Sequence, residues 1–195
     1  MKRDNKLETM VVAALLCAIG IVIPMFAPKI VLPPASYTLG SHVAIFIAVF
    51  ISPPVALAVS AVTTMGFFFA GLPIVIVLRA ATHVVFAFVG AMILKKKKDL
   101  LLSAKGSVLF GLLLAVIHAI NEVLVVTPFF FGNGVPKDYY TNGYFISVII
   151  LIGFGTIVHS MIDYAISLVI WKPLSKVIHI PYNAKMRLST KMPGQ

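Results

Sequence analysis

The sequence predicts an all-α membrane protein with six transmembrane helices and both termini in the cytoplasm. Of its 195 residues, 60% are hydrophobic and only 11% are charged. The mean hydropathy of +1.04 is far above that of water-soluble domains, so the composition excludes a soluble protein. The length leaves room for about six spans of ~20 residues joined by short loops. We therefore expect residues 1–195 to form a single integral domain in the cell membrane.

The positive charges indicate which loops face the cytoplasm. The net charge is +10, and most of the bases fall in three clusters. The clusters are Lys2, Arg3 and Lys6; Lys95, Lys96, Lys97, Lys98 and Lys105; and Lys172, Lys176, Lys185, Arg187 and Lys191. Cytoplasmic loops of membrane proteins collect Lys and Arg. We therefore assign these bases to cytoplasmic loops beside membrane lipid and expect no nucleic-acid partner.

Apolar runs separated by Pro, Gly and charge mark the six helices. The expected segments are 9–26, 42–53, 55–70, 74–94, 106–127 and 144–171. Pro53 and Pro54 favour a tight turn between the second and third segments, because Pro54 lacks an N–H and Pro53 is pushed off helical geometry. Fusing these two segments would place the four-lysine run opposite the basic N-terminus. Keeping the basic clusters on one side therefore requires six spans.

Two outer loops have the composition of ordered lids. The loop KIVLPPASYTLGS, from Lys29 to Ser41, contains Tyr37, and the second loop runs from Phe129 to Gly143. Both mix aromatic residues with Pro, Gly and hydroxyl side chains, which makes them too apolar for floppy linkers. We expect both to fold back over the helix ends, with Tyr37 contributing to a site near the outer face.

Five polar side chains on two helices predict a pocket in the outer half of the membrane. Arg79 and His83 lie four residues apart on one helix, and His118 shares a face with Asn121 and Glu122 on the next. Each ionisable group inserted into a membrane costs about 2.5–3.5 kcal/mol, so each needs a partner or a function. Arg79 and Glu122 lie at matching depth, roughly 8–9 Å from the outer helix ends, with the histidines about one turn deeper. The alternative is a structural ion pair in which Arg79 and Glu122 only neutralise each other and bind no ligand.

Three further ionisable residues receive separate interpretations. His42 follows Ser41 at the start of a helix, where a helix-cap role and a contact with the outer site are equally consistent with the pattern. His159 and Asp163 lie four residues apart in the inner half of the last helix, away from the outer pocket. We interpret them as an internal pair, with a proton relay as the alternative.

No pattern in the chain predicts catalysis, a cofactor or a metal site. The sequence contains no H-E-x-x-H, G-x-S-x-G or Walker A motif, and its carboxylates are few and scattered. The single cysteine, Cys17, excludes a disulfide framework and argues against a cysteine-based metal site. We therefore expect a protein that is not an enzyme.

Small residues mark one face of the first helix. Ala14 and Ala18 form a small-xxx-small pattern, extended by Ala13, Cys17 and Gly20, which permits the close approach of another helix. Internal packing and the docking of another membrane subunit both explain such a face.

Together these features resemble the substrate-binding S components of energy-coupling factor (ECF) transporters, which import vitamins. The resemblance covers the whole chain and rests on its size, its six helices, the Ala14-xxx-Ala18 pattern, the long first outer loop and the basic cytoplasmic side. It implies a protein without ATPase activity that binds a vitamin from outside, under the first loop. It also implies that Ala14 and Ala18 dock onto a membrane coupling subunit driven by two cytoplasmic ATPases.

The stretch PKIVLPPASYTLGSHVAIFIAVFISP is most similar to the niacin-type S components, with the hydroxymethylpyrimidine type second. A pocket containing Arg79, His83 and Asn121 could pair with the carboxylate of nicotinate and stack on its ring. A neutral pyrimidine would instead need hydrogen bonds from Glu122, Asn121 and His118. A membrane scaffold protein without a ligand is the alternative class.

Overall fold

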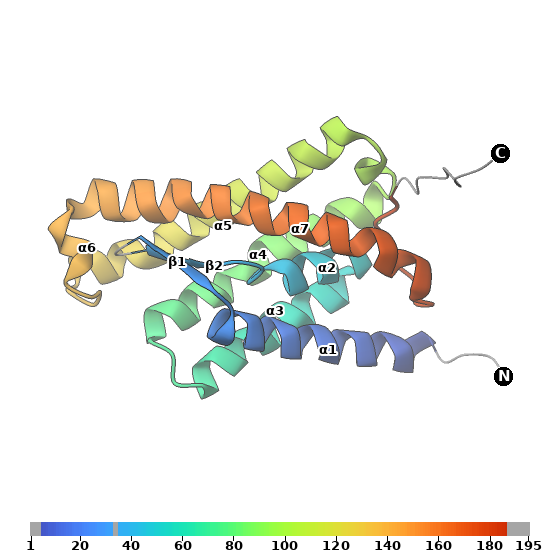
Figure 1. Ribbon diagram of the computed structural model, residues 1–195, viewed down its shortest axis with the longest axis horizontal. Coiled ribbons are helices and arrows are strands. Elements are labelled where there is room, and N and C mark those ends of the chain that lie inside the picture. Colours follow the sequence, from blue (N-terminus) through green and yellow to red (C-terminus); the bar gives the residue numbers. More distant parts are fainter. Residues whose placement is uncertain (1–4, 33–34, 187–195) are drawn as a thin grey trace.

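The computed structural model of this protein describes residues 5–32 and 35–186, which form an elongated bundle of helices (Figure 1). The longer elements are α1 (Asn5–Phe26), α2 (Val43–Ile51), α3 (Pro53–Phe69), α4 (Ile74–Lys96), α5 (Ala104–Phe131), the π-helical segment η2 (Phe145–Phe154) and α7 (Gly155–Val177). A two-stranded hairpin, β1 (Lys29–Leu32) and β2 (Ala35–Thr38), connects α1 to α2, and two short helices are η1 (Leu100–Leu102) and α6 (Asp138–Thr141). The hairpin is a departure from the all-α prediction.

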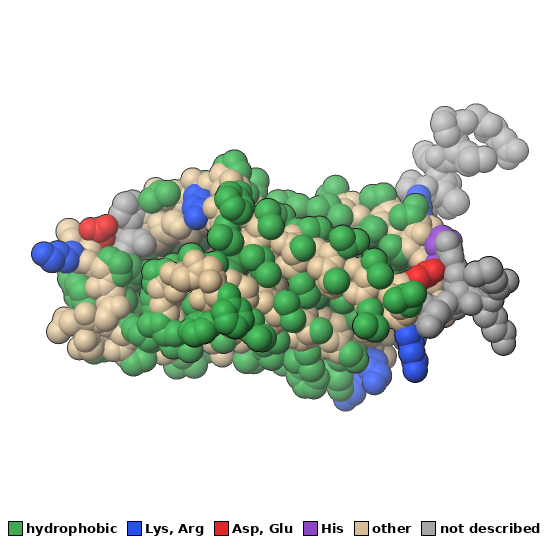
Figure 2. Space-filling model, turned by 90° about the horizontal axis from the view of Figure 1, so that it is seen from below, with side chains coloured by type: hydrophobic (Ala, Val, Ile, Leu, Met, Phe, Trp, Pro, Cys, Tyr) green, Lys and Arg blue, Asp and Glu red, His purple; other side chains and the backbone are tan. Residues whose placement is uncertain are grey.

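Within residues 5–32 and 35–186, four helical segments are long and apolar enough to cross a membrane. They are α1, α4, α5 and the continuous stretch Phe145–Val177, in which η2 runs directly into α7. Their outward faces carry exposed Leu, Ile, Val and Phe side chains, and Figure 2 shows hydrophobic side chains over most of the length of the bundle. A surface of this kind is stable against lipid tails, so the prediction of a helical membrane protein is confirmed at this level.

The break between α2 and α3 lies where the two prolines predict it. Ser52 adopts an extended conformation, with φ −170° and ψ 160°, and Pro53 begins α3. The helix α2 has only 9 residues, all of them buried, and is therefore about 14 Å long against a hydrocarbon core of about 30 Å. This helix is therefore too short to cross the membrane alone.

The hairpin is the ordered form of the first predicted loop. Its strands pair antiparallel, with Lys29 opposite Thr38, and Gly40, at φ +80°, turns the chain from β2 toward α2. The hydroxyl of Tyr37 donates a hydrogen bond to the carbonyl of Leu151. This contact requires a glycine at position 155, because a Cβ there would collide with the Tyr37 hydroxyl.

The segment after α7 folds back onto the core. The N–H groups of Asn183 and Ala184 donate to the carbonyl of Phe50 at 3.1 and 3.0 Å, and the indole N–H of Trp171 donates to the carbonyl of Ala184 at 3.1 Å. These bonds satisfy a carbonyl at the C-terminal end of α2 that lacks a helical partner.

The described members of the three basic clusters lie at one end of the bundle. The N–H of Lys185 donates to the carbonyl of Lys98 at 3.1 Å, and Leu7 and Val177 line one shallow surface pocket. The start of α1, the α4–α5 connection and the end of α7 are therefore neighbours, as Figure 1 also shows. The remaining members, Lys2, Arg3, Arg187 and Lys191, lie outside the described residues.

Candidate functional site

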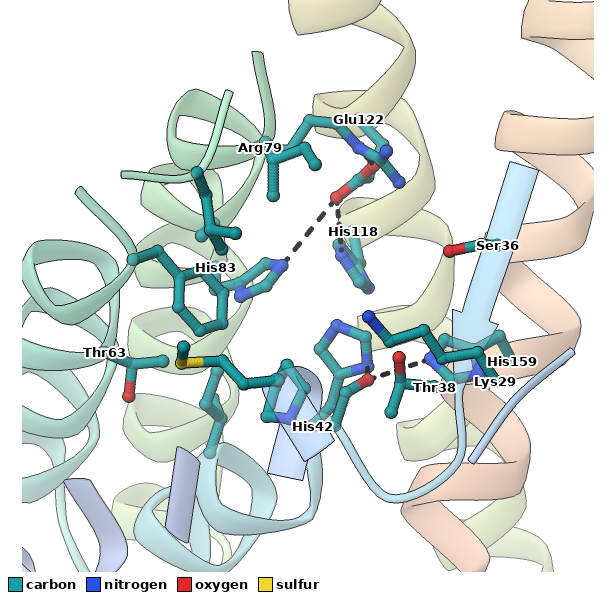
Figure 3. Close-up of a pocket in the computed structure, with 18 residues that line it drawn as sticks. Lys29, Ser36, Thr38, His42, Thr63, Arg79, His83, His118, Glu122 and His159 are labelled. Carbon is teal, nitrogen blue, oxygen red and sulfur yellow. Dashed lines mark hydrogen bonds and ion pairs between the residues drawn. The ribbon is translucent and has the colours of Figure 1, made fainter. Parts of the chain in front are cut away.

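A cavity of about 280 Å³ with several polar groups lies among the end of α1, the hairpin, α2, α3, α4, α5 and α7 (Figure 3). Its polar lining comes from several separate elements. These groups are Lys29, Ser36 and Thr38 of the hairpin, Ser41 and His42 at the start of α2, Thr63 of α3, Arg79 and His83 of α4, His118 and Glu122 of α5, and His159 of α7. Apolar side chains such as Ile45 and Phe67 complete the wall. A small aromatic compound fits the size and the mixed chemistry of this cavity.

Arg79 and Glu122 form an ion pair that faces the cavity. Arg79 Nε donates to Glu122 Oε2, and the opposite carboxylate oxygen, Oε1, lies 3.3 Å from His118 Nε2 and 3.7 Å from His83 Nε2. The Glu122 side chain is only 4% exposed, whereas that of Arg79 is 24% exposed. No described residue accepts a hydrogen bond from the two Nη groups of Arg79, so these donors are available to a ligand.

The interpretation of His159 and Asp163 as a pair remote from this pocket was wrong. His159 lines the cavity, and the Asp163 carboxylate lies 3.0 Å from His42 Nδ1 and 3.5 Å from His159 Nε2. Asp163 also accepts the N–H groups of Gly40 and His42 at 2.7 and 2.9 Å. The hairpin leads the chain inward, so α2 begins at the depth of Asp163, and this carboxylate stabilises its positive N-terminus.

His42 contributes its side chain to the cavity and its backbone to the helix start. Its ring makes no side-chain cap bond, because Asp163 takes that role. The His42 ring centroid lies 4.9 Å from that of His83, 4.7 Å from His118 and 5.1 Å from His159. Four imidazoles from four elements therefore gather around one point, which the spacing of the histidines in the sequence does not reveal.

Two predicted site residues do not line the cavity. Asn121 donates its side-chain amide to the carbonyl of Ile117 at 2.8 Å, because it lies about 100° around α5 from Glu122. Tyr37 packs its ring 5.4 Å from the ring of His159 and holds the hairpin against η2 through Leu151. Burial raises the pKa of Tyr37 above its ordinary value, so its hydroxyl stays protonated as a donor.

Four cavity residues escaped the sequence analysis. Lys29 lies outside the three basic clusters, and this isolated position could have identified it as a candidate site residue. Ser36 and Thr38 alternate along β2, a pattern that a strand assignment would have exposed. Thr63 gave no signal; its Oγ1 is buried, and within the described part of the chain it makes no hydrogen bond.

Apolar helices long enough to span a membrane, arranged around a cavity with polar groups and bordered by a hairpin, define a multi-pass membrane protein with a site for a small solute. No protein-family model and no solved structure matches the chain. The niacin transporter NiaX of Lactococcus lactis subsp. cremoris (strain MG1363) is 37% identical over 183 residues, which cover 91% of this chain and 79% of that relative. The chain belongs to the same family, the niacin-type S components of ECF transporters.

This relationship confirms the class predicted from sequence. The protein is a vitamin-uptake S component in the cell membrane, which it crosses several times. Such a component works with ECF partner subunits. The relationship to a transporter favours a role other than catalysis.

Proposed function

We propose that this chain captures nicotinate from outside the cell and holds it in the central cavity. The observation that carries the proposal is the Arg79 guanidinium, whose Nη groups have no acceptor among the described residues and which lines a cavity of about 280 Å³. A planar guanidinium recognises a carboxylate through two parallel hydrogen bonds. The relative with 37% identity is named a niacin transporter, and niacin is a small aromatic carboxylate.

The cavity offers partners for each part of nicotinate. In this proposal Arg79 binds the carboxylate, and Lys29 adds a second positive charge at the rim. The imidazoles of His42, His83 and His118 and the apolar wall contact the ring. Thr63 Oγ1 can donate to the pyridine nitrogen, since it is buried and has no described partner.

A titration of the purified chain tests this proposal. Nicotinate should bind with one site per chain and more tightly than nicotinamide, because only nicotinate carries the negative charge that Arg79 attracts. Hydroxymethylpyrimidine serves as the third ligand. Tighter binding of the pyrimidine would reassign the substrate, and a chain that binds none of the three would indicate a scaffold protein.

We also propose that the outward face of α1 docks onto a membrane coupling subunit driven by two cytoplasmic ATPases. Ala14 and Ala18 are exposed, whereas Ala13 and Cys17 pack against the core. Gly20 is buried, and a Cβ there would lie 2.7 Å from Thr63 Oγ1. The small residues thus divide into an inner set that packs internally and an outer set that is free for a partner helix.

The proposed topology is a single domain with six spans and both termini in the cytoplasm, and it can be tested by labelling. In a Cys17→Ser background, cysteine at Asn133 should react with an impermeant thiol reagent added outside intact cells. Cysteine at Lys97 should be protected, because that residue belongs to the basic loop assigned to the cytoplasm. Both positions are exposed in the structure, so burial does not account for protection. Labelling of position 97 from outside would rule out this topology.

A further inference from the structure

We propose that His42, His83 and His118 bind one divalent transition-metal ion, of which zinc is the type case. Each residue offers one ring nitrogen, and these nitrogens all lie within 4.8 Å of one another. The three residues are 8%, 8% and 2% exposed, so the cluster is sheltered from bulk water. Figure 3 shows their rings converging in the cavity near Glu122. Imidazole nitrogen is a preferred ligand of zinc, copper and nickel.

Two of the rings have a hydrogen-bond partner at Nδ1, and the Nε2 of His118 also lies 3.3 Å from Glu122 Oε1, a contact that a bound ion would replace. His42 Nδ1 lies 3.0 Å from an oxygen of Asp163, and His118 Nδ1 lies 2.8 Å from the hydroxyl of Ser160. In metal sites such an outer partner fixes the tautomer and leaves Nε2 as the ligand atom. A carboxylate, a histidine and a metal in series are a recurring arrangement of this kind.

The charges around the cluster also favour a cation. Among the described side chains that surround the three histidines, Glu122 and Asp163 are buried carboxylates, at 3% and 0% exposed. Arg79 is the one guanidinium that faces them, and it is paired with Glu122. With neutral histidines, these buried groups and Arg79 carry one negative charge in excess, and the further charged residue in the described lining is Lys29, whose side chain is exposed. A bound carboxylate would add a second negative charge, and one divalent cation would compensate these two negative charges.

Three imidazole ligands leave a tetrahedral zinc ion one further coordination position. Zinc–nitrogen bonds of about 2.0–2.1 Å in a tetrahedron place three nitrogens roughly 3.3 Å apart, so binding would draw these nitrogens together from separations of up to 4.8 Å. Glu122 Oε1 lies 3.3 Å from His118 Nε2 and 3.7 Å from His83 Nε2, so the fourth ligand in this proposal is this carboxylate, water or a bound solute. A second possible group, His42 with His159 and Asp163, shares His42. Because Asp163 already accepts two backbone N–H groups, we place it as the outer partner of His42.

Metal titration of the full chain, purified through a tag without histidine and stripped with a chelator, tests the site. Zinc should bind with one ion per chain in competition with a chromogenic chelator. His83→Ala and His118→Ala should each weaken zinc binding by at least 10-fold, since each removes one of three ligands. His179→Ala is the matched control, because His179 is exposed on the segment after α7 and should leave zinc affinity unchanged. Equal affinity in all four proteins would overturn the proposal.

Cobalt(II) gives a readout that needs no variant and is therefore independent of whether a substitution impairs folding. Bound by three imidazoles and one further ligand, cobalt should show intense visible d–d absorption that zinc displaces stoichiometrically. If cobalt retains the weak spectrum of its hydrated ion in the stripped, folded chain, the cluster is a hydrogen-bonded group of histidines and the metal site is refuted.

A nicotinate titration distinguishes failure of the metal site from failure of the proposed function. Of the three experiments, only this one rests on the proposed function. Zinc-loaded chain should bind nicotinate more tightly than stripped chain, with a smaller gain for nicotinamide, because the ion compensates the carboxylate charge. Nicotinate binding without any zinc binding would overturn the metal site and leave the transport function. Zinc binding without nicotinate binding would overturn the substrate and leave the metal site.

Discussion

Replacing Ala14 with Trp should abolish nicotinate uptake while leaving nicotinate binding by the isolated chain intact. Ala14 and Ala18 are exposed on α1 and do not line the cavity, to which α1 contributes only Pro24 and Met25 near its C-terminal end among the described residues. Small side chains let two helix backbones approach closely in a membrane, and an indole at either position keeps them apart. The substitution therefore acts on assembly with the coupling subunit and not on the cavity.

Uptake of labelled nicotinate by cells that express the chain with an ECF module measures this effect, and co-purification of the coupling subunit shows its cause. Ala165→Trp on α7 is the matched control, because Ala165 is also an exposed alanine on a spanning helix. It should support normal uptake. Equal loss of uptake from both variants, or loss of ligand binding in Ala14→Trp, would show that the α1 face is not a specific docking surface.

The break between α2 and α3 and the contact between α4 and α5 could be predicted from local patterns in the sequence. Pro53 and Pro54 act on their own backbone, so the break between α2 and α3 could be placed from residue type alone. Arg79 and Glu122 met because two antiparallel helices joined by a short loop keep matching depths in register. Both inferences depend on geometry that a helix imposes over a few turns.

The depth of the first loop could not be predicted in the same way. The sequence of the Lys29–Ser41 segment does not indicate how deep the loop lies. In the structure, the hairpin places Ser41 and His42 within hydrogen-bond distance of Asp163. Depth counted along the last helix alone therefore separated His159 and Asp163 from the cavity that they help to build. Contacts between distant segments, 121 positions apart for His42 and Asp163, carry no local signature.

Polar residue type alone also does not distinguish a cavity-lining residue from its neighbour in the sequence. Asn121 and Glu122 are adjacent and both polar, yet only Glu122 lines the cavity, and the helical turn of about 100° decides between them. Tyr37 was expected to contribute to the site from the first outer loop, but it anchors the hairpin and does not line the cavity.

Removing the Arg79 guanidinium should weaken nicotinate binding far more than nicotinamide binding. A charge-assisted hydrogen bond contributes ~1.5–3 kcal/mol, which corresponds to a loss of roughly 10- to 150-fold in affinity. The single variant Arg79→Ala is a poor test, because it leaves the buried Glu122 carboxylate without its partner. An uncompensated buried charge destabilises the fold by about 3–5 kcal/mol.

The informative comparison is therefore made in a Glu122→Gln background, where no buried carboxylate is stranded. If Arg79 binds the substrate carboxylate, adding Arg79→Ala to Glu122→Gln should lower nicotinate affinity by at least the ~10-fold expected for one charged hydrogen bond, with little change for nicotinamide. If Arg79 serves only to neutralise Glu122, the two ligands should lose affinity alike. In that case Arg79→Ala with Glu122→Ala should also recover the thermal stability that Arg79→Ala alone loses. Equal losses together with that recovery would assign Arg79 to the scaffold, and a loss confined to nicotinate would assign it to the binding site.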